Sequence, residues 1–180
     1  MVVASDLVGC RYRLVQRRAH PEMPRTHASI ARAERHAAAV EAVMEMFPRK
    51  GSGRFRRIDL EGDEWERSMR TLEALASGYT HITNAVFATE EWMVRVDLLL
   101  REGDKYTPII VSNHRVARKN DTKTTPAVPT HRLGLSEPLE APYKLRHHAV
   151  DGYRLAFAAR ALRDLGLDSG RGGAIGQDRT

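Results

Sequence analysis

Cysteine is almost absent from this chain of 180 residues, because Cys10 is the only one. A single cysteine excludes a disulfide within the chain and any zinc or iron–sulfur site built from the cysteines of one chain. Long apolar runs are also absent, since no stretch approaches the ~20 residues of a membrane-spanning helix. The first ten residues are too short and acidic for a signal peptide. We therefore expect a soluble cytoplasmic protein without an iron–sulfur cluster and without a membrane partner.

Lysine is scarce as well, although the chain is basic. Five of its 29 basic residues are lysines, so the formal net charge of +6 comes mainly from arginine. The guanidinium fork fits a phosphate group with two parallel hydrogen bonds, which favours a polyanionic partner such as nucleic acid. Codon usage in GC-rich DNA explains the same excess, and both explanations stay open.

The first half of the chain has the 3.6-residue period of helices. A plausible N-cap at Ser5 predicts a short opening helix, and a second apolar stripe predicts a longer helix over residues 26–47. Residues 54–60 are expected to form a short basic strand. A third helix is expected over residues 62–78, with four apolar residues facing inward: Trp65, Met69, Leu72 and Ala76.

The second half begins with a period of about two. Three runs rich in Val, Ile and Leu, at residues 81–87, 92–101 and 106–116, predict an antiparallel meander. Residues 117–142 contain several prolines and no periodic apolar set, so they are expected to form a long surface loop. A strong amphipathic helix should follow and end at Gly166. The chain then divides into one domain, residues 1–168, and a Gly-rich tail, residues 169–180, which we expect either to be disordered or to begin a further region.

One acid, Asp97, lies inside the apolar meander. A carboxylate buried there without a partner costs several kcal/mol, so it needs an arginine or a metal ion. The candidate arginines are Arg95, Arg101 and Arg154. Strand alternation places Asp97 on one face with Arg95 and Leu99, and it gives the next strand a face made of Ile110, Ser112 and His114.

The order of these parts resembles the RecB-like branch of the PD-(D/E)XK nucleases, relatives of the CRISPR-associated RecB-type nucleases. The similarity rests on "SDLVGCRYRL", on "RAERHAAAVEAV" with His36, on "WMVRVDLLLR" with Asp97, on "YTPIIVSNHR", and on "VDGYRLAFAARALRDLGL". The resemblance implies an α/β fold, in which a PD-(D/E)XK core has a central mixed sheet with an antiparallel meander, flanked by helices. It also implies cleavage of DNA with Mg²⁺ or Mn²⁺, held by Asp97 and a second acid.

The chain departs from that family at the positions of the catalytic residues. Ile110 stands where the second acid is expected and Ser112 where the lysine is expected, while Arg154 replaces a glutamine of the last helix. One carboxylate holds Mg²⁺ weakly, and without the lysine nothing nearby stabilises the developing charge. We therefore expect a degenerate site at His36, Asp97, Ser112 and His114, with Asp97 as the metal ligand if there is one.

Three functions follow from this comparison. The first is an inactive pseudo-nuclease that acts as a nucleic-acid-binding or docking module in DNA processing. The second is an active metal-dependent DNA exonuclease with a relocated site, in which His114 and Lys119 replace the missing lysine. The third is a structural subunit of a larger complex, with a protein partner or a homo-oligomer.

Basic residues with interleaved aromatics are typical of a groove that follows phosphates, and DNA is favoured over RNA. A set of solvated faces explains the same pattern. The expected nucleic-acid-binding residues are Arg54, Arg56, Arg57, Arg115, Arg118, Lys119, Lys123, Lys144 and Arg154.

Overall fold

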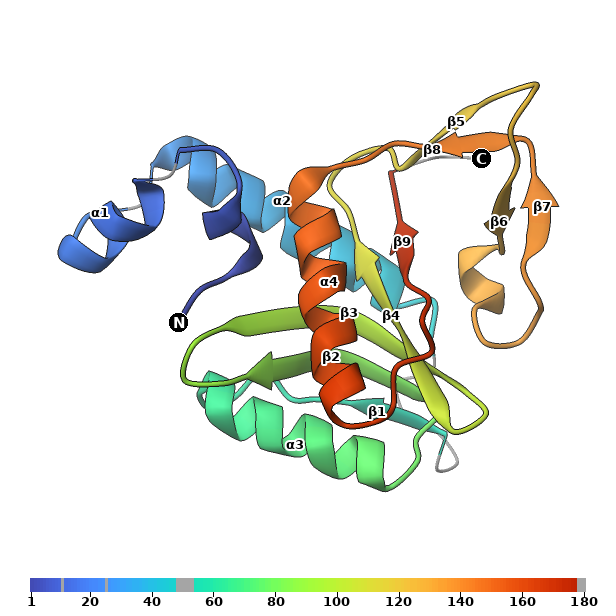
Figure 1. Ribbon diagram of the computed structural model, residues 1–180, viewed down its shortest axis with the longest axis horizontal. Helices are drawn as coiled ribbons and strands as arrows, with labels where there is room; N and C mark the ends of the chain where they lie inside the picture. The colour runs from blue at the N-terminus through green and yellow to red at the C-terminus, as the bar shows by residue number, and fades with distance from the viewer. Residues whose placement is uncertain (11, 25, 48–53, 178–180) are drawn as a thin grey trace.

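The computed structural model describes residues 1–10, 12–24, 26–47 and 54–177. Within them, the protein has a mixed central sheet of five strands and four α-helices (Figure 1). The strands of the central sheet are β1 (Phe55–Arg57), β2 (His81–Ala88), β3 (Met93–Glu102), β4 (Lys105–Val111) and β9 (Gly173–Ile175). The α-helices are α1 (Arg13–Ala19), α2 (His27–Met44), α3 (Glu64–Ala76) and α4 (Ala149–Asp164).

The strand order is β1-β2-β3-β4-β9. The pairs β2–β3 and β3–β4 are antiparallel, so the predicted meander is confirmed. The two outer strands, β1 and β9, run parallel to their neighbours. The sheet is therefore mixed, as expected, and its outer strands come from distant parts of the chain.

The strand β9 corrects the expectation of a tail without structure. Residues 173–175 pair with Ile109, Ile110 and Val111 of β4 through backbone hydrogen bonds. The segment Gly173–Ile175 has no alternating apolar pattern, and a parallel pairing to a buried strand needs none, because the backbone supplies the bonds.

Helices cover both faces of the sheet. On one face, Ala158 and Leu162 of α4 pack with Ile82, Val96 and Leu99 in the larger apolar cluster. On the other face, the C-terminal part of α2 packs against β3 and β4 in a second cluster. Figure 1 shows α4 in front of the strands and α2 behind them. The last turns of α2 are buried, but its N-terminal half is largely open to solvent.

The helix α3 lies along the edge of β2, beyond the point where β1 ends. The hydroxyls of Thr71 and Ser68 accept hydrogen bonds from the backbone N–H groups of Val86 and Ala88, which β1 does not reach. The expected inward face of this helix is therefore correct for Leu72, which packs against the larger apolar cluster, and wrong for the other three residues. Trp65 and Met69 are exposed, because the side facing the sheet needs hydroxyls for the strand edge. The buried residues of α3 are Arg67, Ser68, Thr71, Ala74 and Leu75.

The alternation of side chains shifts by one residue in the middle of the sheet. Asn84 has a positive φ of 58°, in the left-handed region. Thr83 pairs with Leu98 and Ala85 with Val96, so Asn84 and Asp97 are the two residues between regular pairs. The expectation that Arg95, Asp97 and Leu99 share one face is therefore wrong: Leu99 joins the same apolar cluster as Val94 and Val96.

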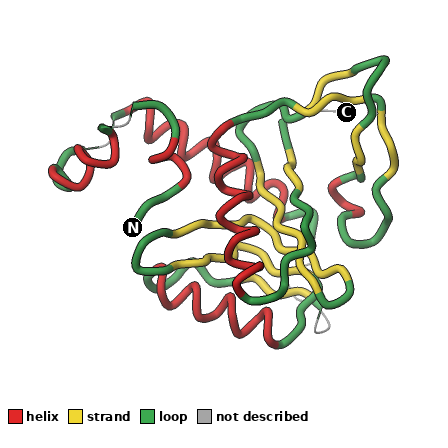
Figure 2. The backbone as a smooth tube through the Cα atoms, in the orientation of Figure 1, coloured by secondary structure: helices red, strands yellow, loops and turns green. Residues whose placement is uncertain are grey.

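The segment expected to be a long loop, residues 117–142, contains regular structure. Its strand β5 (Ala117–Lys119) pairs with β8 (Tyr143–Leu145), which follows the segment, and its strands β6 (Thr125–Ala127) and β7 (Leu139–Ala141) form another two-stranded sheet. A 3₁₀ helix, η2 (Thr130–Arg132), lies between β6 and β7. Figure 2 shows that these strands form an arm beside the central sheet.

The N-terminal segment differs from the expected single helix. It consists of a 3₁₀ helix, η1 (Ala4–Leu7), and the separate helix α1. The buried carboxylate of Asp6 accepts a hydrogen bond from the N–H of Val3 and one from Arg17. These bonds tie α1 to η1, which itself packs against α4.

Candidate functional site

Asp97 lies where β3 and β4 stop pairing, since their regular register begins at Leu98 and Ile109. Its Oδ2 atom accepts a hydrogen bond of 2.6 Å from the N–H of Val111 and one of 2.8 Å from a guanidinium nitrogen of Arg154. The side chains of Asp97 and Arg154 are 10% and 14% exposed. Of the three candidate arginines, Arg154 is therefore the partner of this buried acid.

Arg154 also joins the two strands where they separate. Its guanidinium group donates to the carbonyl oxygens of Val111 on β4 and Arg95 on β3, at 3.3 and 3.1 Å. A buried arginine with one carboxylate and two carbonyl acceptors is well satisfied. The guanidinium thus supplies a positive charge beside Asp97, where the family resemblance implies a metal ion.

A cleft with a volume of ≈ 510 Å³ opens beside this pair. The shifted strands contribute its floor: Asn84, Arg95, Val96 and Asp97. The second half of α2 contributes one wall, which includes His36, Ala37, Val40 and Glu41. The rest comes from Arg57, Leu60, Arg67 and Arg154. We call this site the arginine cleft, because four arginines line it.

Three carboxylates stand among these four arginines. Glu41 pairs with Arg57 at 2.7 Å, and Asp97 pairs with Arg154. Glu64 pairs with Arg95, and it also lies 3.6 Å from a terminal nitrogen of Arg67. The cleft therefore holds one more positive than negative group.

Arg67 is the cation of the cleft that is least satisfied. Its side chain is 9% exposed, and its Nε has no hydrogen-bond partner among the described residues. Burial lowers the pKa of Arg67, and the carboxylate of Glu64 offsets part of that effect. A buried donor without an acceptor is costly, so Arg67 is held at this position at some expense of stability.

The expected degenerate site is brought together only in part. His36 and Asp97 line the same cleft, as do Arg57 and Arg154. Ser112 does not line it, because its hydroxyl donates to Asp151 of α4 at 2.6 Å. The grouping of Ser112 with Asp97 in one site is therefore wrong.

His114 lies outside the cleft as well. Its ring stacks on that of His148, with centroids 4.2 Å apart and an angle of 14° between the planes. His148 is the N-cap residue of α4, and His114 is exposed to solvent. His114 thus contacts His148 and does not line the cleft with Asp97, which its predicted catalytic role requires.

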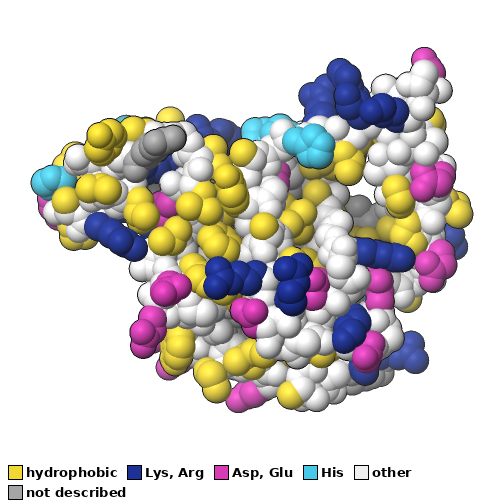
Figure 3. Space-filling view, viewed as in Figure 1, with side chains coloured by type: hydrophobic (Ala, Val, Ile, Leu, Met, Phe, Trp, Pro, Cys, Tyr) yellow, Lys and Arg dark blue, Asp and Glu magenta, His cyan; other side chains and the backbone are white. Residues whose placement is uncertain are grey.

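Four of the nine predicted nucleic-acid-binding residues lie on the arm: Arg118, Lys119, Lys123 and Lys144. Arg118 and Lys144 are opposite each other on β5 and β8, and Lys119 is next to them. We call β5 and β8, with these three residues, the basic ribbon. In the described ranges, none of the three has an ion pair with an acid. Arg115 and Lys123 are exposed nearby, and Figure 3 shows Lys and Arg side chains gathered in this region.

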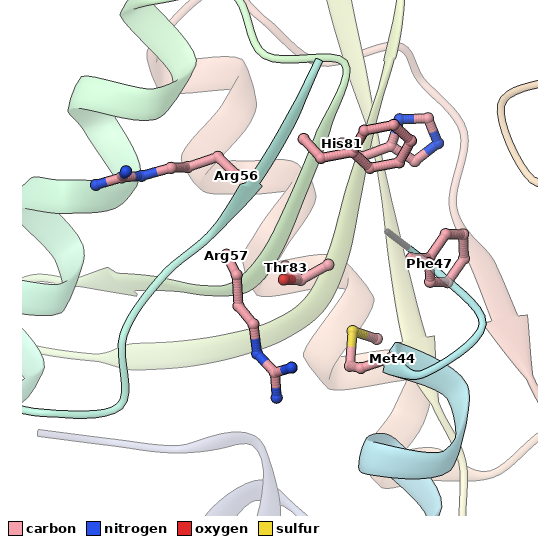
Figure 4. Close-up of a pocket in the computed structure, with 7 residues that line it drawn as sticks. Met44, Phe47, Arg56, Arg57, His81 and Thr83 are labelled. Carbon is pink, nitrogen blue, oxygen red and sulfur yellow. The ribbon is translucent and has the colours of Figure 1, made fainter. Parts of the chain in front are cut away.

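The remaining predicted basic residues, Arg54 and Arg56, belong to the edge around β1. Arg56 lines a second, small pocket of ≈ 20 Å³ with Phe47 and His81 (Figure 4). This volume is about that of one water molecule, so the pocket is too small for a ligand. Arg57 lines both pockets.

His81 in this small pocket is a residue that the sequence reasoning missed. It stacks on Phe55 at 4.4 Å, and its Nε2 lies 3.1 Å from the carbonyl oxygen of Leu133 in the arm. Burial lowers the pKa of His81, and the hydrogen bond with Leu133 offsets part of that effect. His81 therefore holds the arm against the central sheet as a neutral ring.

Arg67 and Asn84 were also missed. Arg67 is four residues before Thr71 on the inward side of α3. Its signal in the sequence was a charged residue at helical spacing from the apolar Ala74 and Leu75. Asn84 is an amide inside an otherwise apolar strand, and Asn tolerates a positive φ better than most residues. Both signals were present, but each was weaker than the apolar pattern around it.

Comparisons with known proteins do not identify relatives of this chain. No family model, no curated protein and no solved structure matches the chain, so no family is assigned. Among the described residues, no group of three or more His, Cys, Asp or Glu side chains is placed to hold a metal ion. No helix in those same ranges is long and apolar enough to cross a bilayer.

Proposed function

We propose that the protein is a DNA-binding module that does not cleave its substrate, built on a RecB-like PD-(D/E)XK core. The observation that carries the binding is the basic ribbon, whose three cations have no acidic partner in the described part of the chain. Residues 114–147 contain seven Lys and Arg against three Asp and Glu. An excess of exposed positive charge on a projecting element is the pattern of phosphate binding.

The shape of the ribbon favours duplex DNA. A two-stranded β-ribbon fits the major groove, and cations on both strands then reach the phosphates that border it. The strands have three residues each, which is too short for reading many base edges. Binding should therefore depend little on sequence and strongly on salt.

The ion pair at Asp97 supports the absence of cleavage. Arg154 and the N–H of Val111 already occupy Oδ2 of this carboxylate, and Ile110 and Ser112 provide no second acid and no lysine. A metal ion would have to displace a guanidinium group that has two further acceptors. The antiparallel meander, the crossing helix α4 and the position of Asp97 support the proposed core.

Fluorescence anisotropy with a labelled 20-base-pair duplex tests the binding. The triple variant Arg118→Gln, Lys119→Gln and Lys144→Gln should bind at least tenfold more weakly at 100 mM salt. The slope of log affinity against log salt should fall by roughly 2 to 3, at about 0.9 for each lost phosphate contact. A matched control, Arg18→Gln, Arg163→Gln and Arg171→Gln, removes the same charge elsewhere and should change both quantities little.

Two results would contradict the proposal. Equal affinity in the ribbon variant and the control would reject the ribbon as the binding surface, and no binding even at low salt would reject DNA binding itself. Cleavage of plasmid DNA with Mg²⁺ or Mn²⁺ that disappears in Asp97→Asn would replace the non-cleaving module with an enzyme that has a relocated site.

A further inference from the structure

The arginine cleft is not explained by DNA binding on the ribbon. Its charged residues come from α2, β1, α3, β3 and α4, and none of them belongs to the arm. Three of its four arginines have a carboxylate within 3 Å, whereas Arg67 shares Glu64 with Arg95 and lies 3.6 Å from it. The unbalanced positive charge of the cleft is therefore located at Arg67.

Arg67 combines burial with an unused donor. Its side chain is nine-tenths buried and lines the cleft, and its Nε has no partner in the described residues. A guanidinium group presents its donors in one plane, in a fork that matches two oxygens of a phosphate. An oxyanion in the cleft would balance the positive charge of this guanidinium group.

Part of the lining of the cleft is apolar. Ala37 and Val40 of α2, with Leu60 and Val96, line the same cleft. The volume of ≈ 510 Å³ is larger than a bare phosphate ion requires and falls within the range of small-molecule pockets. An occupant with an anionic end and a flat, weakly polar body fits the charged and the apolar parts of this lining.

We infer that the arginine cleft binds a phosphate monoester that carries an organic body, such as a nucleotide. Arg67 and Arg95 hold the phosphate, and the apolar wall of α2 and Leu60 contacts the sugar and base. The source of this group is a free nucleotide or the phosphorylated end of a nucleic-acid strand, and only the second source rests on the proposed DNA binding.

Isothermal titration calorimetry with adenosine 5′-monophosphate, adenosine and inorganic phosphate tests the inference on the full chain. The monophosphate should bind, and adenosine should bind at least tenfold more weakly, because it lacks the charge. Inorganic phosphate should compete with the monophosphate but bind more weakly, because it does not contact the apolar wall. No binding of the monophosphate at millimolar concentration, or equal affinity for adenosine, would overturn the inference.

Variants locate the site. Arg67→Gln should reduce affinity for the monophosphate at least tenfold and Arg67→Lys less, since lysine keeps the charge without the fork. Arg95→Gln, whose side chain is mostly exposed, provides a second test if Arg67→Gln fails to fold. Arg163→Gln, outside the cleft, is the control. Unchanged affinity in the folded Arg67 and Arg95 variants would reject the cleft as the site.

A second comparison separates the two sources and the two proposals. Single-stranded 12-mers with a 5′-phosphate and with a 5′-hydroxyl are compared by anisotropy: a preference for the phosphate, lost in Arg67→Gln, assigns the site to strand ends. Equal binding of both, with binding of the monophosphate, assigns it to free nucleotides. The ribbon variant should keep its affinity for the monophosphate, so failure of DNA binding leaves this inference standing, and failure of the cleft leaves the ribbon standing.

Discussion

The arginine cleft and the basic ribbon use the same kind of side chain in opposite ways. In the cleft, Arg57, Arg95 and Arg154 are each paired with a carboxylate, and Arg154 is largely buried. On the ribbon, Arg118 and Lys144 face each other with no acid between them. The cations of the cleft are thus fixed in place by the fold, whereas those of the ribbon are free to follow a partner.

This difference separates selectivity from attraction. A fixed arginine presents its donors at one position, so it distinguishes ligands by shape. Exposed, unpaired cations attract any polyanion and respond to salt. The cleft should therefore be sensitive to the chemistry of a small ligand, and the ribbon to ionic strength. The same contrast predicts that substitutions in the cleft mainly change stability or selectivity, and that those on the ribbon mainly change affinity for DNA.

The largest effect is expected for Asp97→Ala. The substitution leaves the guanidinium of Arg154 and the N–H of Val111 without their shared acceptor in a largely buried place. Breaking a buried pair on one side costs about 3 kcal/mol of unfolding free energy. Urea denaturation measures this loss. Lys119→Ala on the ribbon is the comparison, with no measurable loss expected, and equal effects of the two substitutions would remove the distinction between the regions.

The joint between the arm and the sheet should be the next most sensitive position. Gly134 has a positive φ of 73°, and a Cβ added there would lie 2.8 Å from Nε2 of the buried His81. Gly134→Ala should therefore cost about 2 kcal/mol, from backbone strain and from the forced shift of the ring.

Gly103→Ala is the matched control for this joint. Gly103 has a φ of 64°, and nothing lies within 4 Å of an added Cβ. This control should show the backbone strain alone, so its loss in thermal unfolding should be the smaller of the two. An equal loss in both variants would mean that the contact with His81 does not hold the arm.

A smaller loss should appear when the pH falls. Burial holds the pKa of His81 below its usual value of 6.5, so the folded protein binds this proton less readily than the unfolded chain. The stability that the neutral ring provides is complete above pH 6.5, and it is lost as the pH falls from there through the lowered pKa. The decrease in melting temperature between pH 7.5 and pH 5 should be smaller in His81→Gln, and the same decrease in both proteins would exclude His81 as its cause.

The elements with strong periodicity were predictable from the sequence. The apolar residues of the meander recur with the two-residue period of strands, and those of the helices α2 and α4 recur with the 3.6-residue period of helices. The strand β9 was not predictable, because three residues that pair through the backbone leave no side-chain pattern. The arm was missed for a related reason, since its four strands have three residues each.

The site was predictable only where it follows from a single strong anomaly. Asp97 in an apolar strand required a partner, and Arg154 was among the three candidates. The cleft itself depends on the shift of alternation at Asn84, which changes the side of the sheet that several residues face. A regular two-residue period cannot indicate such a shift, so Arg67 could not be placed near Asp97 from the sequence.

The smallest effect, and the one that relates the two regions most directly, concerns Lys144. Its position opposite Arg118 on the neighbouring strand brings two like charges together, which is unfavourable in a β-ladder. Lys144→Glu should therefore raise the unfolding free energy by about 0.5 kcal/mol, because it turns a repulsion into an ion pair. The same change should weaken DNA binding more than Lys144→Gln does, because it adds a negative charge to the binding surface. Thermal unfolding and anisotropy on the three proteins measure both quantities. A gain in stability with a loss of DNA affinity would mean that the unpaired cations of the ribbon reduce the stability of the fold. The cleft avoids this cost, because its arginines are paired with carboxylates. If Lys144→Glu lowers stability, or leaves DNA affinity intact, the ribbon is an ordinary solvated surface.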